Sequence, residues 1–551
     1  MKRLLGISNI ITLFLFAGMI CFPFLGEVHL FDWEETLIAS VSKEMFFQNE
    51  VLEPLLNGTY YLEKPPFFFW CQLISFKYLG INEYAARFPN AVCLLFVVLT
   101  LYRNGKRIYS ANFGMMWALI YLSIILAQFY HKSGLIEPWF HFFIYLAIYN
   151  FARILEMRQE QNESYFKRGD IAYSRFYAAF ATSVAVLTNG MEGFFIIILS
   201  YWLVFLFSSA RYGIGVVNFV KYIFWVLIFV GIWVAIEYKW HGTNYLKAFY
   251  NYQLADIDIT KASLTRKMAI PILVLLLGCF PASAICFNSL RPKTYESTIQ
   301  KIFRLFMICS LFLVLIIVTF VKDKLVHFTS FTYFPISFLA AYSLRYIFEE
   351  GVRIKASTWF LMISIGAVWA SLLIAIPASR ANIGFFGNFI PVETIQSVLK
   401  LTYQWQEYEQ FIGYGFLSLF IISLGLMIAG RARYGFIVLF FSAMLISQII
   451  LIYYTPKLEQ LSQGAQVDFV LQHRDKPSQF IYHNGRSYLP NFYSNYPYRS
   501  DSNLRIETAK STKKKPVYLI KKTDDTTQGY LLSKKCRHLY NHGIYSFYKV
   551  K

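Results

Sequence analysis

The sequence has little charge for its length and few cysteines. Only 15% of its 551 residues are charged, against roughly 25% in soluble globular domains. The seven cysteines form no CxxC pair and no metal-ligand spacing, and no internal repeat or low-complexity linker is present. These absences exclude a disulfide scaffold, a coiled coil and a disordered chain. They also argue against a nucleic-acid partner, because nucleic-acid binders with much excess positive charge are usually polar.

Hydrophobic and aromatic residues fill the place of the missing charge. They make up 56% and 19% of the chain, with 55 Phe and 40 Tyr, beside a net charge of +20. A membrane-spanning helix needs about 20 mostly apolar residues. The sequence therefore predicts an all-α polytopic membrane protein with about thirteen spans. They are expected near residues 8–25, 89–103, 112–130, 136–153, 171–187, 193–208, 217–238, 269–288, 302–321, 328–347, 357–377, 411–429 and 434–455.

Lysine and arginine distinguish the two sides of this predicted bundle. With the N-terminus in the cytoplasm, every loop expected inside contains Lys or Arg, whereas most short outer loops contain few. The first span follows Met1-Lys2-Arg3 and resembles a signal peptide. No clean small-x-small cleavage site precedes Gly26, so we expect this span to be retained as a helix. The odd number of spans then places the C-terminus outside.

Two parts of the chain are expected to differ in structure. Residues 1–455 form the membrane domain, whose first outer segment (26–88) is long enough for interfacial helices. Residues 456–551, the tail, are predicted to form a small outer α/β domain with strands in 478–489, 515–522 and 543–551. The tail has 17 Lys and Arg against 7 Asp and Glu. This excess favours anionic membrane lipids or an anionic acceptor.

Three carboxylates stand at the start of the first outer segment. Asp32, Glu34 and Glu35 precede an expected helix whose apolar residues recur at three- and four-residue spacing up to Phe47. Carboxylates at a helix start are favoured by the helix dipole. They are therefore either helix caps or candidate catalytic groups.

Four more stretches place polar residues at expected outer boundaries. In YLEKPP (61–66) two prolines stiffen the chain after Tyr61, Glu63 and Lys64, and such a lysine suits a lipid-linked phosphate or simply snorkels. Glu137 precedes Pro138 and is either a cap or a site. The other two stretches are LTNGMEG (187–193), which allows a tight turn, and residues 322–327 with Lys324 and His327, which form either a basic site or a plain charged loop.

These stretches, in this order, resemble the GT-C glycosyltransferases. The likeness is to the protein O-mannosyltransferase-like family and to bacterial 4-amino-4-deoxy-L-arabinose lipid A transferases, and residues 81–95 (INEYAARFPNAVCLL) share it. The resemblance implies an enzyme of the bacterial inner membrane, with its C-terminal domain in the periplasm. Such an enzyme moves a sugar, with inversion, from a polyprenyl phosphate to a lipid, glycan or protein acceptor.

The resemblance also implies roles for individual residues. Glu34 matches the acidic residue that acts as base on the acceptor hydroxyl, with Asp32 as the runner-up and Glu137 at the second acidic position. The remaining matches belong to substrate binding, namely Glu35, Tyr61, Glu63, Lys64, Asn189, Lys324 and His327. The chain departs from the family's pattern in having Glu where Asp is common, and Asn189 where Lys is common.

Other functions stay open at this point. A transporter or flippase for a lipid-linked sugar is expected to have charged residues deep in its spans and repeated halves, whereas the charges here lie mainly at boundaries. A degenerate paralogue without activity and a basic membrane scaffold are further alternatives. No metal ligands are assigned, because no metal spacing appears; family members differ in metal use, so a divalent metal remains an option.

Overall fold

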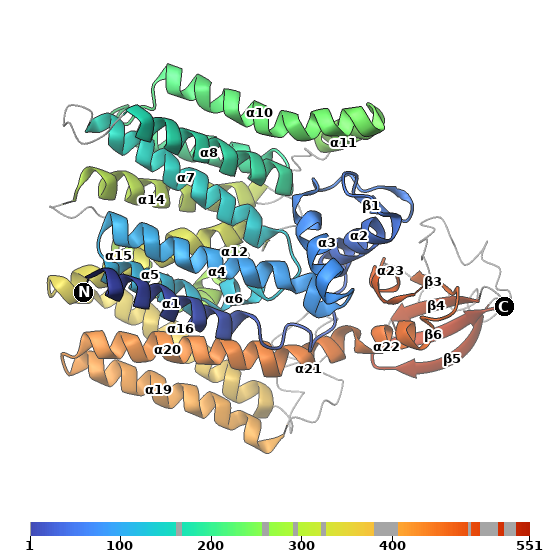
Figure 1. The fold of residues 1–551 in the computed structure, drawn as a ribbon. Helices are drawn as coiled ribbons and strands as arrows, with labels where there is room; N and C mark the ends of the chain where they lie inside the picture. The colour runs from blue at the N-terminus through green and yellow to red at the C-terminus, as the bar shows by residue number, and fades with distance from the viewer. Residues whose placement is uncertain are drawn as a thin grey trace.

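The computed structural model describes most of the 551-residue chain. The described residues are 2–160, 168–255, 264–289, 296–320, 327–378, 406–482, 486–495, 516–522 and 536–551. Long helices run side by side, and the first outer segment lies together with the tail at one end of them, opposite the N-terminus (Figure 1). We call this the sheet end. The segments predicted to share the outer side of the membrane thus share one end of the bundle.

Helices form nearly all of the first 455 residues that the structure describes. In the first half they are α1 (Lys2–Cys21), α2 (Glu34–Gln48), α3 (Phe67–Leu79), α4 (Glu83–Ile108), α5 (Ala111–Ser123), α6 (Ile125–His131), α7 (Glu137–Gln159), α8 (Arg168–Asn189), α9 (Glu192–Phe207), α10 (Val216–His241) and α11 (Asn244–Ala255). They continue with α12 (Leu264–Gly278), α13 (Ala282–Cys286), η1 (Phe287–Ser289), α14 (Thr298–Phe320), η2 (His327–Thr332), α15 (Tyr333–Glu349), α16 (Ala356–Ala378), η4 (Glu407–Glu409), α19 (Gln410–Ile428) and α20 (Ala432–Ile449).

Each predicted span falls on one of these helices or on a bent pair of them. Within the described residues, six helices are long and apolar enough to cross a membrane, or up to eight if each bent pair counts as one span. The polytopic helical fold is therefore confirmed, whereas the number of about thirteen spans stays a prediction. Aromatic side chains fill the bundle, as where Trp117 meets Phe338 at 5.1 Å between ring centroids and Phe338 meets Phe303 at 5.0 Å.

The span expected at 112–130 is bent. Helices α5 and α6 meet at 76°, with Ile124 extended between them. A break inside a bundle frees backbone carbonyls that need donors. The hydroxyl of Ser123 donates to the Ile120 carbonyl at 2.7 Å, and the Gln128 amide donates to the Leu122 carbonyl. Side chains next to the break therefore satisfy it locally.

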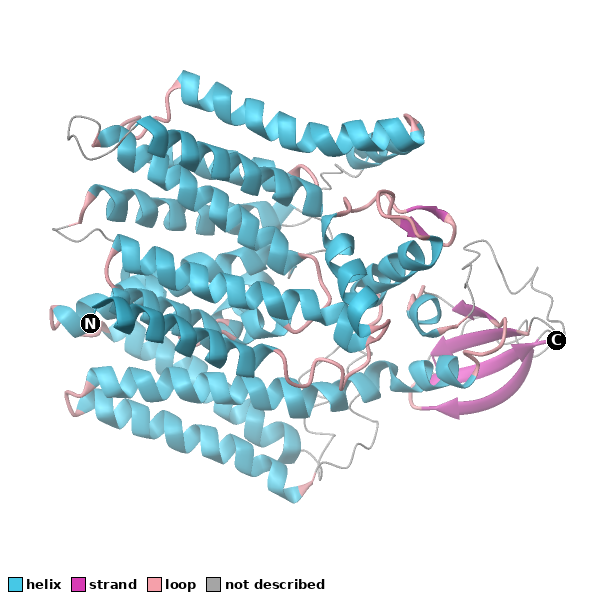
Figure 2. Ribbon diagram, in the orientation of Figure 1, coloured by secondary structure: helices cyan, strands magenta, loops and turns pink. Residues whose placement is uncertain are grey.

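The tail contains a four-stranded sheet, and strands gather at this end of the molecule (Figure 2). Its order is β3-β4-β6-β5, with β3 (Gln479–Tyr482) parallel to β4 (Val517–Lys522), and β6 (Tyr545–Val550) antiparallel to both β4 and β5 (Cys536–His542). The strand expected over 478–489 is confirmed at Gln479–Tyr482. It is wrong over the described residues 486–489, where the chain leads into a short helix, α23 (Leu489–Tyr493), with Pro490 in its first turn. Strand β5 was not expected. The seven cysteines are all free.

The last long helix of the bundle continues into the tail. Residues Ala432–Gln472 form one helix of 41 residues, made of α20, a π turn η5 (Ile450–Tyr454), α21 (Thr455–Glu459), a second π turn η6 (Gln460–Gly464) and α22 (Ala465–Gln472). The span was expected to end near residue 455. No flexible linker therefore separates the bundle from the tail.

The tail docks on the first outer segment through a shared core and specific polar contacts. Leu30, Ala39 and Phe76 are buried in one cluster with side chains of α22 and the sheet. The short pairing of β1 (Leu55–Leu56) with β2 (Thr59–Tyr60) closes the loop beside α2. Lys43 of α2 reaches the end of α23, where its ammonium donates to the carbonyls of Phe492 at 2.6 Å and Ser494 at 2.7 Å.

Replacing this lysine is expected to loosen the tail. Lys43→Met removes a charge-assisted donor to backbone carbonyls, each such bond being worth about 1.5–3 kcal/mol. Limited proteolysis should then cleave residues 456–551 faster than in the wild type. Lys549→Met, on an exposed strand position, is the matched control and should cleave at the wild-type rate. Equal protection of both variants would show that Lys43 does not hold the tail.

Candidate functional site

The start of α2 has an unusual backbone conformation. Trp33, between Asp32 and Glu34, has φ 84° and ψ −94°, a left-handed conformation that costs a non-glycine residue of the order of 1–3 kcal/mol. Its N–H donates to Asp32 Oδ1 at 2.8 Å, and its ring meets Tyr488 of the tail edge-on. Strain of this kind concentrates at functional sites. Two of the predicted carboxylates, Asp32 and Glu34, thus flank the strained residue Trp33.

Glu34 and Glu137 both lie at helix N-termini of the sheet end. Glu34 begins α2 and Glu137 begins α7, and both are half-buried. The positive end of each helix dipole favours the charged carboxylate. Tyr130 of α6 is buried and interacts electrostatically with both glutamates. The two residues predicted to be catalytic are therefore brought into one neighbourhood from opposite ends of a stretch of about a hundred residues.

Lys64 and Asn189 meet directly. The Lys64 ammonium donates to Asn189 Oδ1 at 2.5 Å, and the Asn189 amide donates to Glu192 Oε2 at 2.6 Å. A tight turn between α8 and α9 makes this contact, with Gly190 at φ 85° as its left-handed residue. Two of the predicted substrate-binding residues, 125 positions apart in the sequence, thus share one contact.

The segment around Lys64 is held on both sides. Gln253 of α11 donates to the carbonyls of Leu62 and Glu63, at 3.2 Å each. On the other side, the Tyr61 hydroxyl donates to Glu63 Oε2 at 3.1 Å. Burial raises the pKa of Tyr61, and the nearby charges of Glu63 and Glu34 raise it further. Tyr61 is therefore hydrogen-bonded to Glu63 and within electrostatic range of the candidate base Glu34.

Glu35 has a different environment from Glu34. It is buried, and Arg87 donates to it through Nε at 2.7 Å and Nη2 at 2.9 Å. The N–H groups of Phe31 and Gly134 donate to the same carboxylate at 2.8 and 2.6 Å. A carboxylate with this many donors has little capacity left for a ligand. The structure favours a structural role for Glu35 over the substrate contact predicted for it.

Asp32 connects the site to the tail. Its Oδ1 accepts from the N–H of Tyr488 at 3.0 Å, while its own N–H donates to Gln463 at 2.7 Å. Burial raises the pKa of Asp32, and hydrogen bonds from Ser487 and from the N–H groups of Trp33 and Tyr488 oppose this rise. A raised pKa suits a base, but the docking contacts occupy this carboxylate. Tyr488 was not predicted from the sequence.

The basic residues expected before the tenth span are only partly described. Lys324 lies outside the described residues. His327 begins η2, a short helix that packs against α7 and α14. The hydroxyl of Ser330 in η2 lies 2.9 Å from Nδ1 of His141 in α7, so η2 is fixed to the helix that begins with Glu137. The predicted roles of Lys324 and His327 stay predictions.

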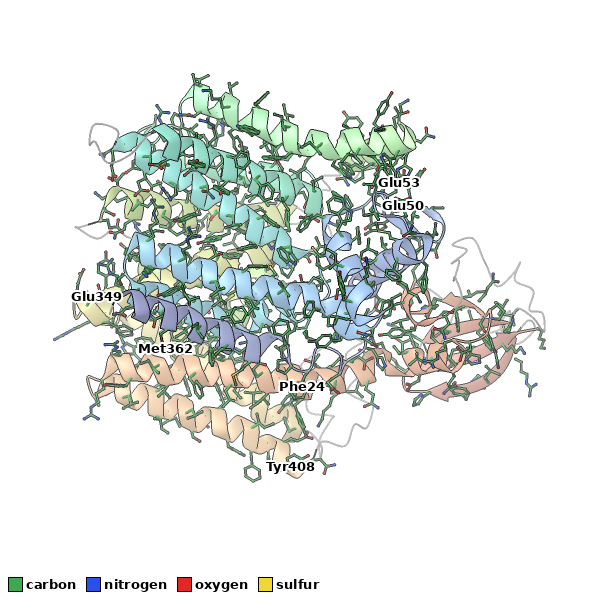
Figure 3. All side chains as sticks on the ribbon, viewed as in Figure 1. Phe24, Glu50, Glu53, Glu349, Met362 and Tyr408 are labelled. Atoms are coloured by element: carbon green, nitrogen blue, oxygen red, sulfur yellow. The ribbon has the colours of Figure 1, made fainter. Side chains whose placement is uncertain are left out.

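A cavity of about 480 Å³ lies at the opposite end of the bundle, between α1, α5, α15 and α20. Its lining is mostly Phe, Met, Ile and Leu, and it includes Glu349, which Figure 3 shows at the end of the bundle away from the sheet. None of the predicted site residues contributes to it. This cavity is therefore separate from the candidate site.

The fold is shared with a solved crystal structure. The crystal structure of ArnT from Cupriavidus metallidurans bound to undecaprenyl phosphate superposes on the whole chain with a TM-score of 0.70, at 14% identity, and 98% of that protein is covered. The chain has the ArnT fold. The predicted resemblance to the GT-C glycosyltransferases is thereby confirmed.

Proteins similar in sequence match the chain over shorter stretches than the ArnT structure does. An uncharacterised protein of Aquifex aeolicus is 25% identical over 396 residues, which are 71% of this chain and 72% of that protein. The undecaprenyl phosphate-alpha-4-amino-4-deoxy-L-arabinose arabinosyl transferase of Photorhabdus laumondii is 28% identical over 120 residues, or 22% of each chain. The match thus spans about a fifth of that transferase. No family model matches the chain.

Proposed function

We propose that this protein is an integral membrane glycosyltransferase that takes its sugar from a polyprenyl phosphate. The observation that carries the proposal is the meeting of Lys64 with Asn189 beside Tyr61, Glu63 and Glu34, at one end of a bundle with the ArnT fold. Cationic and carboxylate groups at a membrane boundary are costly unless they are used. A phosphate-linked sugar and a hydroxyl acceptor need both types of group.

In the proposed reaction Glu34 accepts the proton of the acceptor hydroxyl. The hydroxyl oxygen forms a bond to the anomeric carbon, and the bond from that carbon to the phosphate oxygen breaks on the opposite face, which inverts the centre. Polyprenyl phosphate leaves with the electron pair, and Lys64, which can exchange Asn189 for a phosphate oxygen, stabilises its charge. Glu137 orients the acceptor, and Lys324 and His327 add positive charge near the donor.

The location and the acceptor are part of the same proposal. We place the sheet end, with residues 456–551 as its α/β domain, in the periplasm of a bacterium with the N-terminus in the cytoplasm. The acceptor is a lipid, glycan or protein reached from that side. A flippase would bind the same donor without breaking its sugar–phosphate bond.

Replacing Lys64 tests the donor site in reconstituted vesicles. The wild type should release polyprenyl phosphate from at least one of a panel of polyprenyl-phosphate sugars, read by mass spectrometry together with a glycosylated lipid, glycan or protein. Lys64→Met should raise the KM for the donor by about ten- to hundredfold, because a charge-assisted contact of about 1.5–3 kcal/mol is lost. Lys77→Met, exposed on α3, is the control and should change nothing.

Other outcomes separate the alternatives. Movement of intact donor across the vesicle membrane without release of polyprenyl phosphate would identify a flippase. No consumption of any donor, with the folded protein present, would identify a degenerate paralogue. Release of polyprenyl phosphate with unchanged KM in Lys64→Met would keep the enzyme but remove the lysine from the donor site.

A further inference from the structure

A second group of ionisable residues lies at the far end of α2 from Glu34. Glu50 and Glu53 follow α2 and approach the C-terminal end of α10, which ends with Glu237 and His241 in its last turns (Figure 3). Asn49 ends α2 in a left-handed conformation and directs the chain toward α10. About twenty ångströms of helix separate this group from Glu34, since fifteen residues rise 1.5 Å each. The proposed transfer reaction does not use it.

The four side chains surround a small volume. Nδ1 of His241 lies 3.2 Å from Glu237 Oε1 and 3.5 Å from Glu53 Oε1, and Nε2 lies 3.5 Å from Glu50 Oε2. One ligand atom from each of Glu50, Glu53 and His241 lies within 4.8 Å of the others. The other oxygen of Glu50 accepts from the N–H groups of Val51 and Leu52 at 2.9 Å each. The loop backbone thus fixes this carboxylate with Oε2 toward the imidazole.

Negative charge exceeds positive charge in this group, and two of its three carboxylates are buried. Glu237 is 0% exposed and Glu53 is 6% exposed. Glu237 Oε2 and Glu53 Oε1 are buried atoms that accept no hydrogen bond from an N–H or hydroxyl group, and the two carboxyls are close enough to share a proton. No lysine or arginine in the described part of the chain pairs with any of the three carboxylates. Tyr60 and Tyr245, the other titratable groups facing them, bring no positive charge.

Buried carboxylates without cations are expensive. One imidazole cannot balance three carboxylates even when it is protonated. The group therefore requires either protons or a metal ion.

The distances around His241 fit a shared cation. The contact of Nδ1 with Glu237 Oε1, at 3.2 Å, is also within hydrogen-bond range, whereas the 3.5 Å contacts with Glu53 Oε1 and Glu50 Oε2 are longer than an N–H···O bond. Two ligand atoms that are each about 2.1 Å from a tetrahedral metal lie about 3.4 Å apart. The separations around Nδ1 fit ligands of a shared cation. A carboxylate facing the second ring nitrogen, as Glu50 does, is the usual partner of a metal-bound imidazole.

We propose that Glu53, Glu237 and Nδ1 of His241 bind one divalent transition-metal cation, such as Zn²⁺ or Mn²⁺, with Glu50 orienting the imidazole through Nε2. The imidazole selects transition metals over Mg²⁺ and Ca²⁺, which prefer oxygen ligands alone. The cation fastens the first outer segment to the end of α10. The next helix, α11, supplies Gln253, which holds the segment around Lys64.

Metal analysis of the untagged full-length protein tests this site. Elemental mass spectrometry should find about one transition-metal ion per chain, and a chelator should lower Tm, with Zn²⁺ or Mn²⁺ restoring it. Glu53→Gln, Glu237→Gln and His241→Gln should each lose the ion, lower Tm and remove the effect of the chelator. Glu27→Gln, exposed in the same outer segment, is the control and should keep both the ion and Tm.

If the group binds no cation, the glutamine variants should change Tm in the opposite direction. Without a cation, Glu53→Gln or Glu237→Gln relieves repulsion between buried carboxyls, so the Tm of these variants should rise or stay the same. The chelator should then leave the Tm of the wild type unchanged. Restoration by Mg²⁺ or Ca²⁺ alone would overturn the choice of metal. If a variant does not fold, the metal content of the wild type still decides.

The pH dependence gives an independent check on the same ligands. Metal ligands must be deprotonated to bind. The stabilisation by Zn²⁺ or Mn²⁺ should therefore fade as the pH falls and protons compete for the carboxylates and the imidazole. A metal effect that stays equally large at acidic pH would argue against these residues as ligands.

Discussion

Glu34→Gln is expected to lower kcat for sugar transfer by about 10²–10⁴-fold, the usual contribution of a general base. The amide keeps the size of the side chain and the helix start, but it cannot accept the acceptor's proton. The KM for the donor should stay nearly constant, because Lys64 and Asn189 are untouched. Single-turnover release of polyprenyl phosphate, measured beside the circular-dichroism spectrum of the variant, separates lost chemistry from lost folding.

Two neighbouring substitutions make this result specific. Asp32→Asn keeps Glu34 but weakens the contact with Tyr488, so it should mainly loosen the tail and leave most of kcat. If Asp32→Asn instead abolished transfer while Glu34→Gln did not, Asp32 would be the base. Glu137→Gln should reduce transfer as well, through the acceptor's KM. Full activity in both glutamate variants would rule out the proposed site.

Arg87→Met is expected to lower the free energy of unfolding by about 3–5 kcal/mol, since it leaves Glu35 charged, buried and without its cation. The loss is larger than that of a surface ion pair because Arg87 also donates to three backbone carbonyls. These belong to Leu25 at 2.8 Å, Val28 at 2.7 Å and His29 at 3.0 Å. Thermal unfolding in detergent should show a clear fall in Tm.

Further variants identify the guanidinium geometry as the cause. Arg87→Lys keeps the charge but cannot make the forked contacts, so its Tm should fall between the wild type and Arg87→Met. Arg103→Met, exposed on the same helix, should match the wild type. A wild-type Tm in Arg87→Met would mean that the path from α1 to α2 does not depend on this pair.

The helices were predictable because apolar runs of sufficient length leave the chain few other solutions in a membrane. The predicted helix boundaries are wrong where contacts with other parts of the chain determine the structure. The bend after Ser123 depends on the amide of Gln128, and a continuous apolar run does not reveal it. The helix through residues 456–472 is polar and was missed, because it is stabilised by its contacts with the first outer segment rather than by hydropathy.

The candidate site also contains residues that the sequence indicated and residues that it could not. Glu34, Glu137 and Lys64 were singled out because each stands in a distinctive motif at an expected membrane boundary, beside a helix start or prolines, and because these motifs resemble those of a known family. The resemblance assigned Glu34 as the base and left Asp32 as the alternative, but nothing in the sequence indicated that Glu35 is occupied by Arg87. Tyr488 and Gln463 lie more than 400 residues from Asp32, and no local pattern marks their approach.

Because the helix Ala432–Gln472 is unbroken, the number of residues in it fixes the angle at which the tail meets the candidate site. Each helical residue rotates the rest of the chain by about 100° around the helix axis and advances it by 1.5 Å. The π turns at Ile450–Tyr454 and Gln460–Gly464 each accommodate one extra residue in the winding. Deleting or inserting a single residue there would swing the sheet around the helix axis and carry Gln463 and Tyr488 away from Asp32. Relatives can therefore exchange tails only if they keep the residue count between the bundle and the sheet.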